Sequence, residues 1–497
     1  MFTRGRRALI GLVWKSGTLA LATLLAGCAT VAPGETIAEG LILDNVNVVD
    51  VRDGSIASRR AIVVADGRIV RIVASGSVGA NGAARTIDGN GAFVVPGFND
   101  MHAHNLNTAS PQTSLPAMLA SGVTGFRQMA PVEPATNLAL ITGETPALLA
   151  QPGPLLAGPA FATAVTARAE VARQQAAGVD FVKVVDLPAA AFLAAAAEAR
   201  SAGLAFSGHL PPTVDPRIAV QGGMTAIEHM GPTISLLLAC SRDEAPIRAI
   251  LSNLPPGPGV NFAMDPARLQ RLLANPTLLT PPQGFLLIRR VLATYDETRC
   301  RAFAAQLAAS PAWIVPTLTR LEAMNLGNSA ELRDNPDLRY VPQGSRAMWR
   351  EVGSDFDAKL TAEQRQTLAD LFAAQLKLTG LFAQAGVKMM AGTDFGGQWL
   401  VPGRSLHREF DLLARSGVPP LRVLQMATID PARFLGREAS MGSVEAGRNA
   451  DLVLLAADPT VSVANLHRIV GVMRAGRYLP QADLEAMSAA VVGTLQR

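Results

Sequence analysis

One stretch decides the fold: FVVPGFNDMHAH, residues 93–104. It joins a short apolar run to two histidines, His102 and His104, that stand two positions apart. Side chains two positions apart in an extended chain point to the same side, so the two imidazoles are expected to converge. A His-X-His pair alone is a weak signal that also arises by chance on protein surfaces, and its meaning depends on the rest of the chain.

Apolar segments that alternate with helical patterns surround this stretch, which predicts strand–helix–strand units and a parallel sheet. The expected strands are residues 93–98, 122–127, 155–157, 181–185, 205–207, 226–228, 313–316 and 388–390. Eight such strands predict an α/β fold with a (β/α)8 TIM barrel over residues 96–435. Roughly 80 residues separate the sixth strand from the seventh, more than a barrel unit needs, so we expect an insertion at about residues 232–311.

Both ends of the chain carry strand patterns outside the barrel. Residues 41–50 alternate, residues 61–70 contain an Asp66-Gly67 turn between two apolar runs, and residues 91–95 are apolar. Asp-Gly between apolar runs is a strong hairpin signal. Similar strands are expected at residues 451–455 and 469–473, the latter followed by a turn at Gly476. A small β-sandwich domain built from residues 40–95 and 436–483 is the prediction.

The composition excludes some classes of protein. The 497 residues are 49% hydrophobic and 17% charged, which indicates a folded rather than a disordered chain. Lysine and arginine number 44 against 40 acidic residues, so the net charge is only +4. The sequence has no basic run with interleaved aromatic residues, and a nucleic-acid partner is therefore not expected.

The N-terminus has the pattern of an export signal. Three arginines fall within the first seven residues, an apolar run covers residues 17–25, and Cys28 follows small residues. This arrangement resembles a bacterial lipoprotein cleavage site, so we expect a signal peptide at residues 1–27, lipidation of Cys28 and a tether over residues 28–39. The alternative is an uncleaved anchor, but the run is shorter than the roughly 20 residues that a spanning helix needs. The protein is thus predicted to be exported and to contact the membrane only through its lipid.

Two further cysteines lie near the two ends of the predicted insertion, Cys240 and Cys300. In an oxidising compartment an even number of remaining cysteines favours pairing, so we predict a disulfide. The alternative is two buried thiols.

Four more residues with metal-binding side chains stand on or at the ends of predicted strands: Lys183, His209, His229 and Asp394. Lys183 is one of five lysines and stands among apolar residues, where it either extends to solvent or reacts with carbon dioxide to give an anionic carbamate. Each histidine alone is more often structural, and an aspartate before glycines is usually a turn residue. However, four of the six histidines in the chain fall at such strand ends, which favours one shared site.

The combined motifs resemble the amidohydrolase superfamily, and most closely the branch of imidazolonepropionase-like enzymes and binuclear Xaa-Pro dipeptidases. The resemblance spans about residues 40–480 and rests on residues 96–104, Lys183, His209, His229, residues 392–394, residues 426–433 and residues 442–452. The long insertion departs from the family pattern, as does Asn99.

The resemblance implies a centre with two divalent metal ions. His102, His104 and Asp394 would hold the first ion, His209 and His229 the second, and a carboxylated Lys183 would bridge them. Zinc suits imidazole and carboxylate ligands best, although manganese or cobalt could use the same set. Asp394 would also be the catalytic residue that carries the proton.

Three other residues are candidates for contact with the substrate. Arg127 and Arg320 could pair with a substrate carboxylate, or could be ion-paired or solvated arginines. His407 could line the pocket or support a ligand, or have no chemical role. The insertion could form a lid, or an extra pair of surface helices.

The leading hypothesis is a metal-dependent hydrolase that cleaves an amide or peptide bond in a small molecule, such as a dipeptide or an N-acyl amino acid. The alternative within the superfamily is a cyclic amide or imidazolone hydrolase or a deaminase, which often needs no bridging lysine. A third hypothesis is a binding lipoprotein without activity, which the complete ligand set argues against. The sequence leaves a homo-oligomer open.

Overall fold

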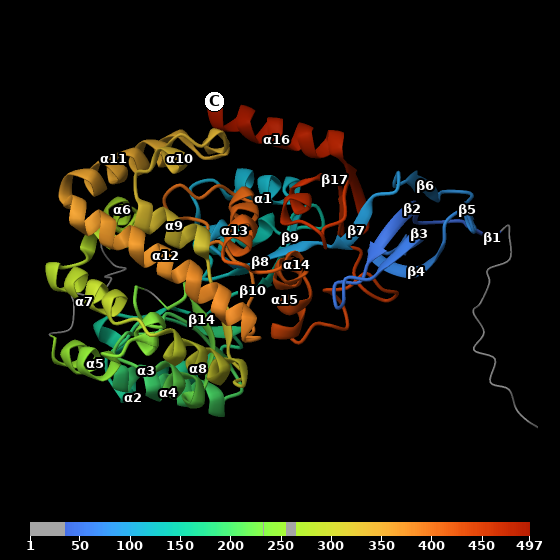
Figure 1. The fold of residues 1–497 in the computed structure, drawn as a ribbon. Coiled ribbons are helices and arrows are strands. Elements are labelled where there is room, and N and C mark those ends of the chain that lie inside the picture. The colour runs from blue at the N-terminus through green and yellow to red at the C-terminus, as the bar shows by residue number, and fades with distance from the viewer. Residues whose placement is uncertain (1–34, 232, 255–264) are drawn as a thin grey trace, which may run out of the picture.

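The computed structural model describes residues 35–231, 233–254 and 265–497 (Figure 1). The predicted signal peptide and Cys28 lie outside these residues and stay predictions. Residues 35–37 of the predicted tether instead form a short strand, β1 (Glu35–Ile37), which pairs with β5 (Val78–Ala80). Among the helices of the described residues, none has both the length and the apolar character needed to cross a membrane.

Parallel strands form the centre of the molecule, and helices lie in the connections between them. The predicted α/β class is therefore confirmed. A three-stranded sheet has the order β10-β9-β8, and a five-stranded sheet has the order β11-β12-β13-β14-β15. Their bounds are β8 (Phe98–Ala103), β9 (Val123–Gln128), β10 (Ala147–Ala150), β11 (Leu156–Ala157), β12 (Phe181–Asp186), β13 (Ala205–Gly208), β14 (Met224–Glu228) and β15 (Trp313–Val315). β10 was not predicted, and the predicted strand 93–98 divides into β7 (Phe93–Pro96) and β8.

The two parallel sheets do not join into one closed sheet, which differs from the predicted barrel. Residues 388–390, expected as the eighth strand, form isolated bridges instead: Met389 pairs with Ile314, and Phe395 farther along pairs with Ala103. On the other side, Pro152 pairs with Phe181. The backbone at Asp394 has a positive φ of 56°.

The two ends of the chain meet in a mixed sheet, as the sequence indicated. The eight-stranded sheet has the order β18-β17-β16-β7-β2-β3-β4, with β6 beside β2. Its other strands are β2 (Leu41–Val49), β3 (Ile56–Ala65), β4 (Arg68–Ala74), β6 (Arg85–Asp88), β16 (Leu452–Leu455), β17 (Ile469–Arg474) and β18 (Arg477–Pro480). Figure 1 shows the blue N-terminal strands in the same part of the molecule as red β17. The β-sandwich and its boundaries stay a prediction, since these strands form one large sheet and one short pair.

Helices follow the strands and fill the connections between them. The first four are α1 (Pro111–Ala120), α2 (Ala164–Ala176), α3 (Ala189–Ser201) and α4 (Pro216–Gly222). The predicted insertion contains α5 (Glu244–Asn253), α6 (Pro266–Ala274), α7 (Pro282–Ala293) and α8 (Glu297–Ala308). Cys240 and Cys300 form a disulfide across it, as predicted.

A second long connection, between β15 and residue 388, was not foreseen from the sequence. It contains α9 (Leu318–Leu326), α10 (Ala330–Arg333), α11 (Gln343–Lys359) and α12 (Ala362–Gln384). The remaining helices are α13 (Arg404–Arg415), α14 (Pro420–Ala427), α15 (Ile429–Phe434) and α16 (Gln481–Gln496).

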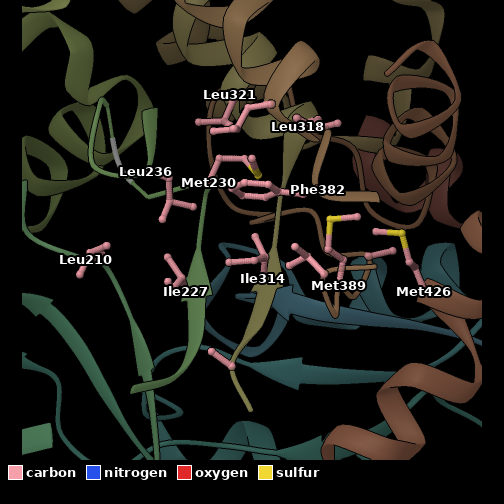
Figure 2. Packing of buried hydrophobic residues seen from close by; sticks show 14 of the residues in the cluster. Leu210, Ile227, Met230, Leu236, Ile314, Leu318, Leu321, Phe382, Met389 and Met426 are labelled. Atoms are coloured by element: carbon pink, nitrogen blue, oxygen red, sulfur yellow. The ribbon is translucent and has the colours of Figure 1, made fainter. Parts of the chain in front are cut away.

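A close-packed apolar core supports the strands from which the candidate site is built. Ile227 of β14 and Ile314 of β15 lie on neighbouring strands, with Phe382 of α12 and Met389 close by (Figure 2). All four side chains are fully buried. Removing such residues leaves cavities that cost several kcal/mol, so the ends of these strands are held in place by packing.

Candidate metal centre

His102, His104 and Asp394 meet at the end of β8. The Nε2 atoms of His102 and His104 lie 3.2 and 3.1 Å from Asp394 Oδ1. One ligand atom from each residue can be chosen so that all three lie within 4.8 Å of one another, a spacing that one cation can bridge. The first predicted ligand set is therefore brought together.

The backbone holds Asp394 against the strand that carries the histidines. The Asp394 amide donates to the carbonyl oxygen of His102 at 2.7 Å. The neighbouring Thr393 hydroxyl donates to Asp100 Oδ2 at 2.6 Å. Burial opposes ionisation of Asp394, but its interactions with His102 and His229 and its hydrogen bonds with His102 and His104 outweigh burial and hold its pKa well below the usual range. Asp394 is thus a carboxylate at neutral pH.

Lys183 of β12 is buried beside this group rather than extended to solvent. Its side chain is 2% exposed, and its Nζ has no hydrogen-bond partner among the described residues. Burial lowers its pKa to about 8, although the charges of Glu228 and Asp394 oppose the shift. At pH 7 a pKa of 8 leaves about a tenth of the amine neutral, roughly 300 times more than an ordinary lysine. A neutral, unpartnered amine is the form that can react with carbon dioxide.

His209 and His229 follow β13 and β14 and complete the cluster. The His229 ring centroid lies 5.0 Å from that of His209 and 4.5 Å from that of His102. His229 Nδ1 is 2.8 Å from the Thr317 hydroxyl oxygen, which leaves Nε2 free. Burial lowers the pKa of His209 to about 3 and that of His229 well below its usual value, so both are neutral.

The amine of Lys183 lies within electrostatic range of three of these imidazoles. Its charge contributes to the lowered pKa values of His104, His209 and His229, in each case after burial. All six residues predicted as metal ligands thus gather in one region of the molecule.

Arg127 has a different position from the one expected for a substrate contact. The side chain is completely buried, donates from Nε to the Met101 carbonyl oxygen at 2.7 Å and pairs through Nη2 with Glu228 Oε1 at 2.7 Å. The prediction that Arg127 binds a substrate carboxylate is wrong, because the guanidinium is enclosed in the protein and its charge is already paired.

Glu228, which the sequence reasoning missed, joins Arg127 to the metal centre. Its Oε2 lies 2.7 Å from His102 Nδ1. Burial raises the pKa of Glu228, but the charge of Arg127 and the interaction and hydrogen bond with His102 outweigh burial and lower the pKa to about 2. The available signal was an acidic residue directly before His229 in a buried strand, where an unpaired charge is not tolerated.

Arg320 is close to the centre but is also already engaged. Its Nε lies 3.1 Å from Asp394 Oδ2. Its Nη1 and Nη2 donate to the carbonyl oxygens of Ala274 and Leu273 at 2.7 and 2.6 Å. These carbonyls belong to the last two residues of α6. Arg320 therefore connects the insertion to the Asp394 carboxylate, and its guanidinium is not free to bind a substrate. That the insertion acts as a lid stays a prediction.

His407 lies elsewhere, on α13. Its Nε2 donates to the Ser121 carbonyl oxygen at 2.8 Å, and its ring lies 4.9 Å from that of His467. It lines a groove of about 1120 Å³ between α1, α13 and α16. The contacts of His407 thus involve none of the predicted metal ligands, and its predicted role at the site is not supported.

Known proteins resemble this chain in part of its sequence and over most of its fold. Residues 374–479 match the model of the amidohydrolase family. No curated protein matches the sequence. A bottromycin amidohydrolase structure superposes with a TM-score of 0.66 at 20% identity, over 91% of this chain and 90% of the other.

Two further structures are similar in fold. An Xaa-Pro dipeptidase with methionine bound in its active site has a TM-score of 0.55 at 16% identity, over 88% of this chain and 99% of the other. An ochratoxinase from A. niger has a TM-score of 0.53 at 15% identity, over 88% and 95%. The resemblance noted in the sequence is confirmed at the level of the superfamily, while likenesses this distant bear on the fold and not on the substrate.

Proposed function

Since the chain resembles the amidohydrolase superfamily in both its C-terminal sequence and its fold, we propose that it is a metal-dependent hydrolase of an amide or peptide bond. The substrate class we propose is a dipeptide or an N-acyl amino acid. The observation that carries the proposal is the meeting of His102, His104 and Asp394 beside the buried amine of Lys183, which has no hydrogen-bond partner in the described part of the chain. A structural core would not retain an unpaired lysine amine, because losing its hydration without a partner is costly.

The residues present fit a pair of divalent ions. His102, His104 and Asp394 would hold one ion, His209 and His229 the other, and Lys183, converted to a carbamate, would bridge them. The donor set of neutral imidazoles and carboxylates suits zinc. When bound, two such cations lower the pKa of water toward neutrality and stabilise negative charge that develops on a carbonyl oxygen.

Asp394 is the group that moves the proton. It is a carboxylate at neutral pH, its Oδ1 lies between two imidazoles, and Arg320 lies 3.1 Å from Oδ2. A carboxylate so placed accepts a proton from the attacking water and delivers it to the leaving amine nitrogen. Arg320 limits the orientations that this carboxylate can take.

Lys183 favours this hydrolase over the alternative of a cyclic amide hydrolase or deaminase with a single ion. A site for one ion does not need a second anionic ligand on β12, and an ordinary lysine would not be buried there without a partner among the residues that the structure describes. The complete ligand set likewise disfavours a binding lipoprotein without activity.

Export is part of the proposal and rests on the N-terminal sequence alone. Residues 1–28 would direct the chain across a membrane and anchor it through lipid on Cys28. The Cys240–Cys300 disulfide is compatible with an oxidising compartment.

The test is metal analysis of the purified protein, followed by hydrolysis assays with a panel of dipeptides and N-acyl amino acids. We expect two equivalents of divalent metal and an activity that a chelator abolishes and zinc restores. Full activity in protein that has been shown to contain no metal would contradict the proposal.

A further inference from the structure

The imidazole of His102 lies between two carboxylates. Its Nε2 is 3.2 Å from Asp394 Oδ1, and its Nδ1 is 2.7 Å from Glu228 Oε2. Asp394 is partly exposed at the site, whereas Glu228 is completely buried. A ring held in this way has a fixed plane and a fixed assignment of its two nitrogens. Nδ1–H donates to Glu228, and Nε2 points toward the predicted metal ligand Asp394.

Glu228 is itself held by Arg127, which is equally buried. Arg127 Nη2 donates to Glu228 Oε1 at 2.7 Å, and its Nε donates to the carbonyl oxygen of Met101, the residue before His102. The Arg127 guanidinium carbon lies 5.4 Å and 5.1 Å from the ring centroids of Phe181 and Phe434. The guanidinium therefore contacts both the carboxylate and the strand that carries the histidine.

We propose that Glu228, held by Arg127, is a positioning residue that accepts a hydrogen bond from His102 Nδ1 and so orients the ring with Nε2 directed to the metal. The inference rests on the proposed function, because it assigns Glu228 a role toward that metal centre. Carboxylates that accept from the second nitrogen of a metal-binding histidine fix its tautomer and raise its basicity. Here the carboxylate belongs to Glu228, the residue just before the predicted ligand His229. The end of β14 therefore supplies both the positioning carboxylate and a metal ligand.

A purely structural ion pair is the competing explanation, and metal affinity separates the two. If Glu228 only compensated the charge of Arg127, replacing both by neutral residues of similar size would leave metal binding unchanged. If Glu228 orients His102, the metal affinity falls even when the buried charges are removed together.

The experiment measures the affinity of the full chain for Co²⁺, by competition with a chromophoric chelator and from the visible absorption of the bound ion. The variants are Glu228→Gln and the double variant Arg127→Met/Glu228→Gln, which leaves no unpaired buried charge if the single variant fails to fold. The matched control is Glu322→Gln. Glu322 is a buried glutamate of α9 that pairs with Arg408 at 2.7 Å rather than with a histidine.

We expect both Glu228 variants to bind Co²⁺ about 10- to 100-fold more weakly with an altered absorption spectrum, and the control to stay within about twofold of the wild type. Affinity of the double variant equal to that of the wild type would overturn the inference, as would an equal loss in the control. Failure of the wild type itself to bind Co²⁺ would overturn this inference and the proposed function together. Binding by the wild type with no effect of the Glu228 variants would overturn the inference alone.

Discussion

Glu409 of α13 is a buried acid that the proposed chemistry does not use, and replacing it tests the electrostatics of the interior. Its Oε2 accepts from the Thr319 amide at 2.8 Å, near the start of α9, while Oε1 has no partner among the described residues. Burial raises its pKa to about 8; the nearby charges of Asp100 and Glu322 add to the shift, and the amides of Thr319 and Leu318 oppose it. The folded protein therefore keeps this carboxyl protonated at neutral pH.

The sign of the effect on stability follows from the direction of the shift. The pKa is about 8 in the folded state and near 4.5 in the unfolded state, so between these values the folded state binds more protons. Stability then falls as the pH rises through that range, by about 1.4 kcal/mol per unit. Between pH 5 and pH 7.5 the loss attributable to Glu409 is about 3 kcal/mol.

The assay is urea unfolding of the wild type and Glu409→Gln at several values between pH 5 and pH 8. The glutamine keeps an oxygen for the Thr319 amide but cannot ionise. The advantage of the variant should be small at pH 5 and grow by about 3 kcal/mol at pH 7.5. The control is Glu485→Gln, in which an exposed glutamate of α16 is replaced. A stability difference between Glu409→Gln and the wild type that does not change with pH would refute the reasoning.

Three further predictions concern the site and the insertion. Asp394→Asn should lower kcat by about 10²- to 10⁴-fold with a much smaller change in KM, since it removes the proton carrier; steady-state kinetics showing near-normal kcat would exclude that role. Arg320→Met should lower the free energy of unfolding by about 3 kcal/mol and also lower kcat, because the carbonyl oxygens at the end of α6 and Asp394 Oδ2 would lose their partner. Unchanged urea unfolding and unchanged turnover would show that this connection is unimportant. Replacing Cys240 and Cys300 by serine should cost about 4 kcal/mol of stability, the chain entropy of a loop of about 60 residues; equal urea midpoints for variant and wild type would contradict this.

Local patterns in the sequence predicted most of the strands and the residues at their ends. Alternation and apolar runs located β2, β9, β12 and β14, because these signals depend on neighbouring residues alone. The metal-ligand candidates could be found because histidine is rare in this chain and because His102, His209, His229 and Asp394 each follow or end an apolar run. The disulfide followed from cysteine number and the expected compartment.

The features of the fold and of the site that the sequence did not predict depend on contacts between residues far apart in the chain. Arg127 could not be assigned from the sequence, because its partner, Glu228, is 101 positions away. The contacts of Arg320 could not be assigned for the same reason, since it donates to carbonyls at the end of α6 that only the folded insertion brings near. Residues 388–390 read as a strand, but only an isolated bridge between Met389 and Ile314 forms there. Helices α9–α12 were not predicted, because the strand patterns at residues 313–316 and 388–390 mark only the two ends of this connection.

The most direct test of the metal centre is a crystal structure of the wild type grown with zinc and bicarbonate, with anomalous data collected at the zinc edge. We expect two anomalous peaks, one between His102, His104 and Asp394 and one beside His209 and His229, with electron density extending the Lys183 amine to a carbamate that contacts both ions. An unmodified Lys183 in a cluster without anomalous peaks would contradict the account.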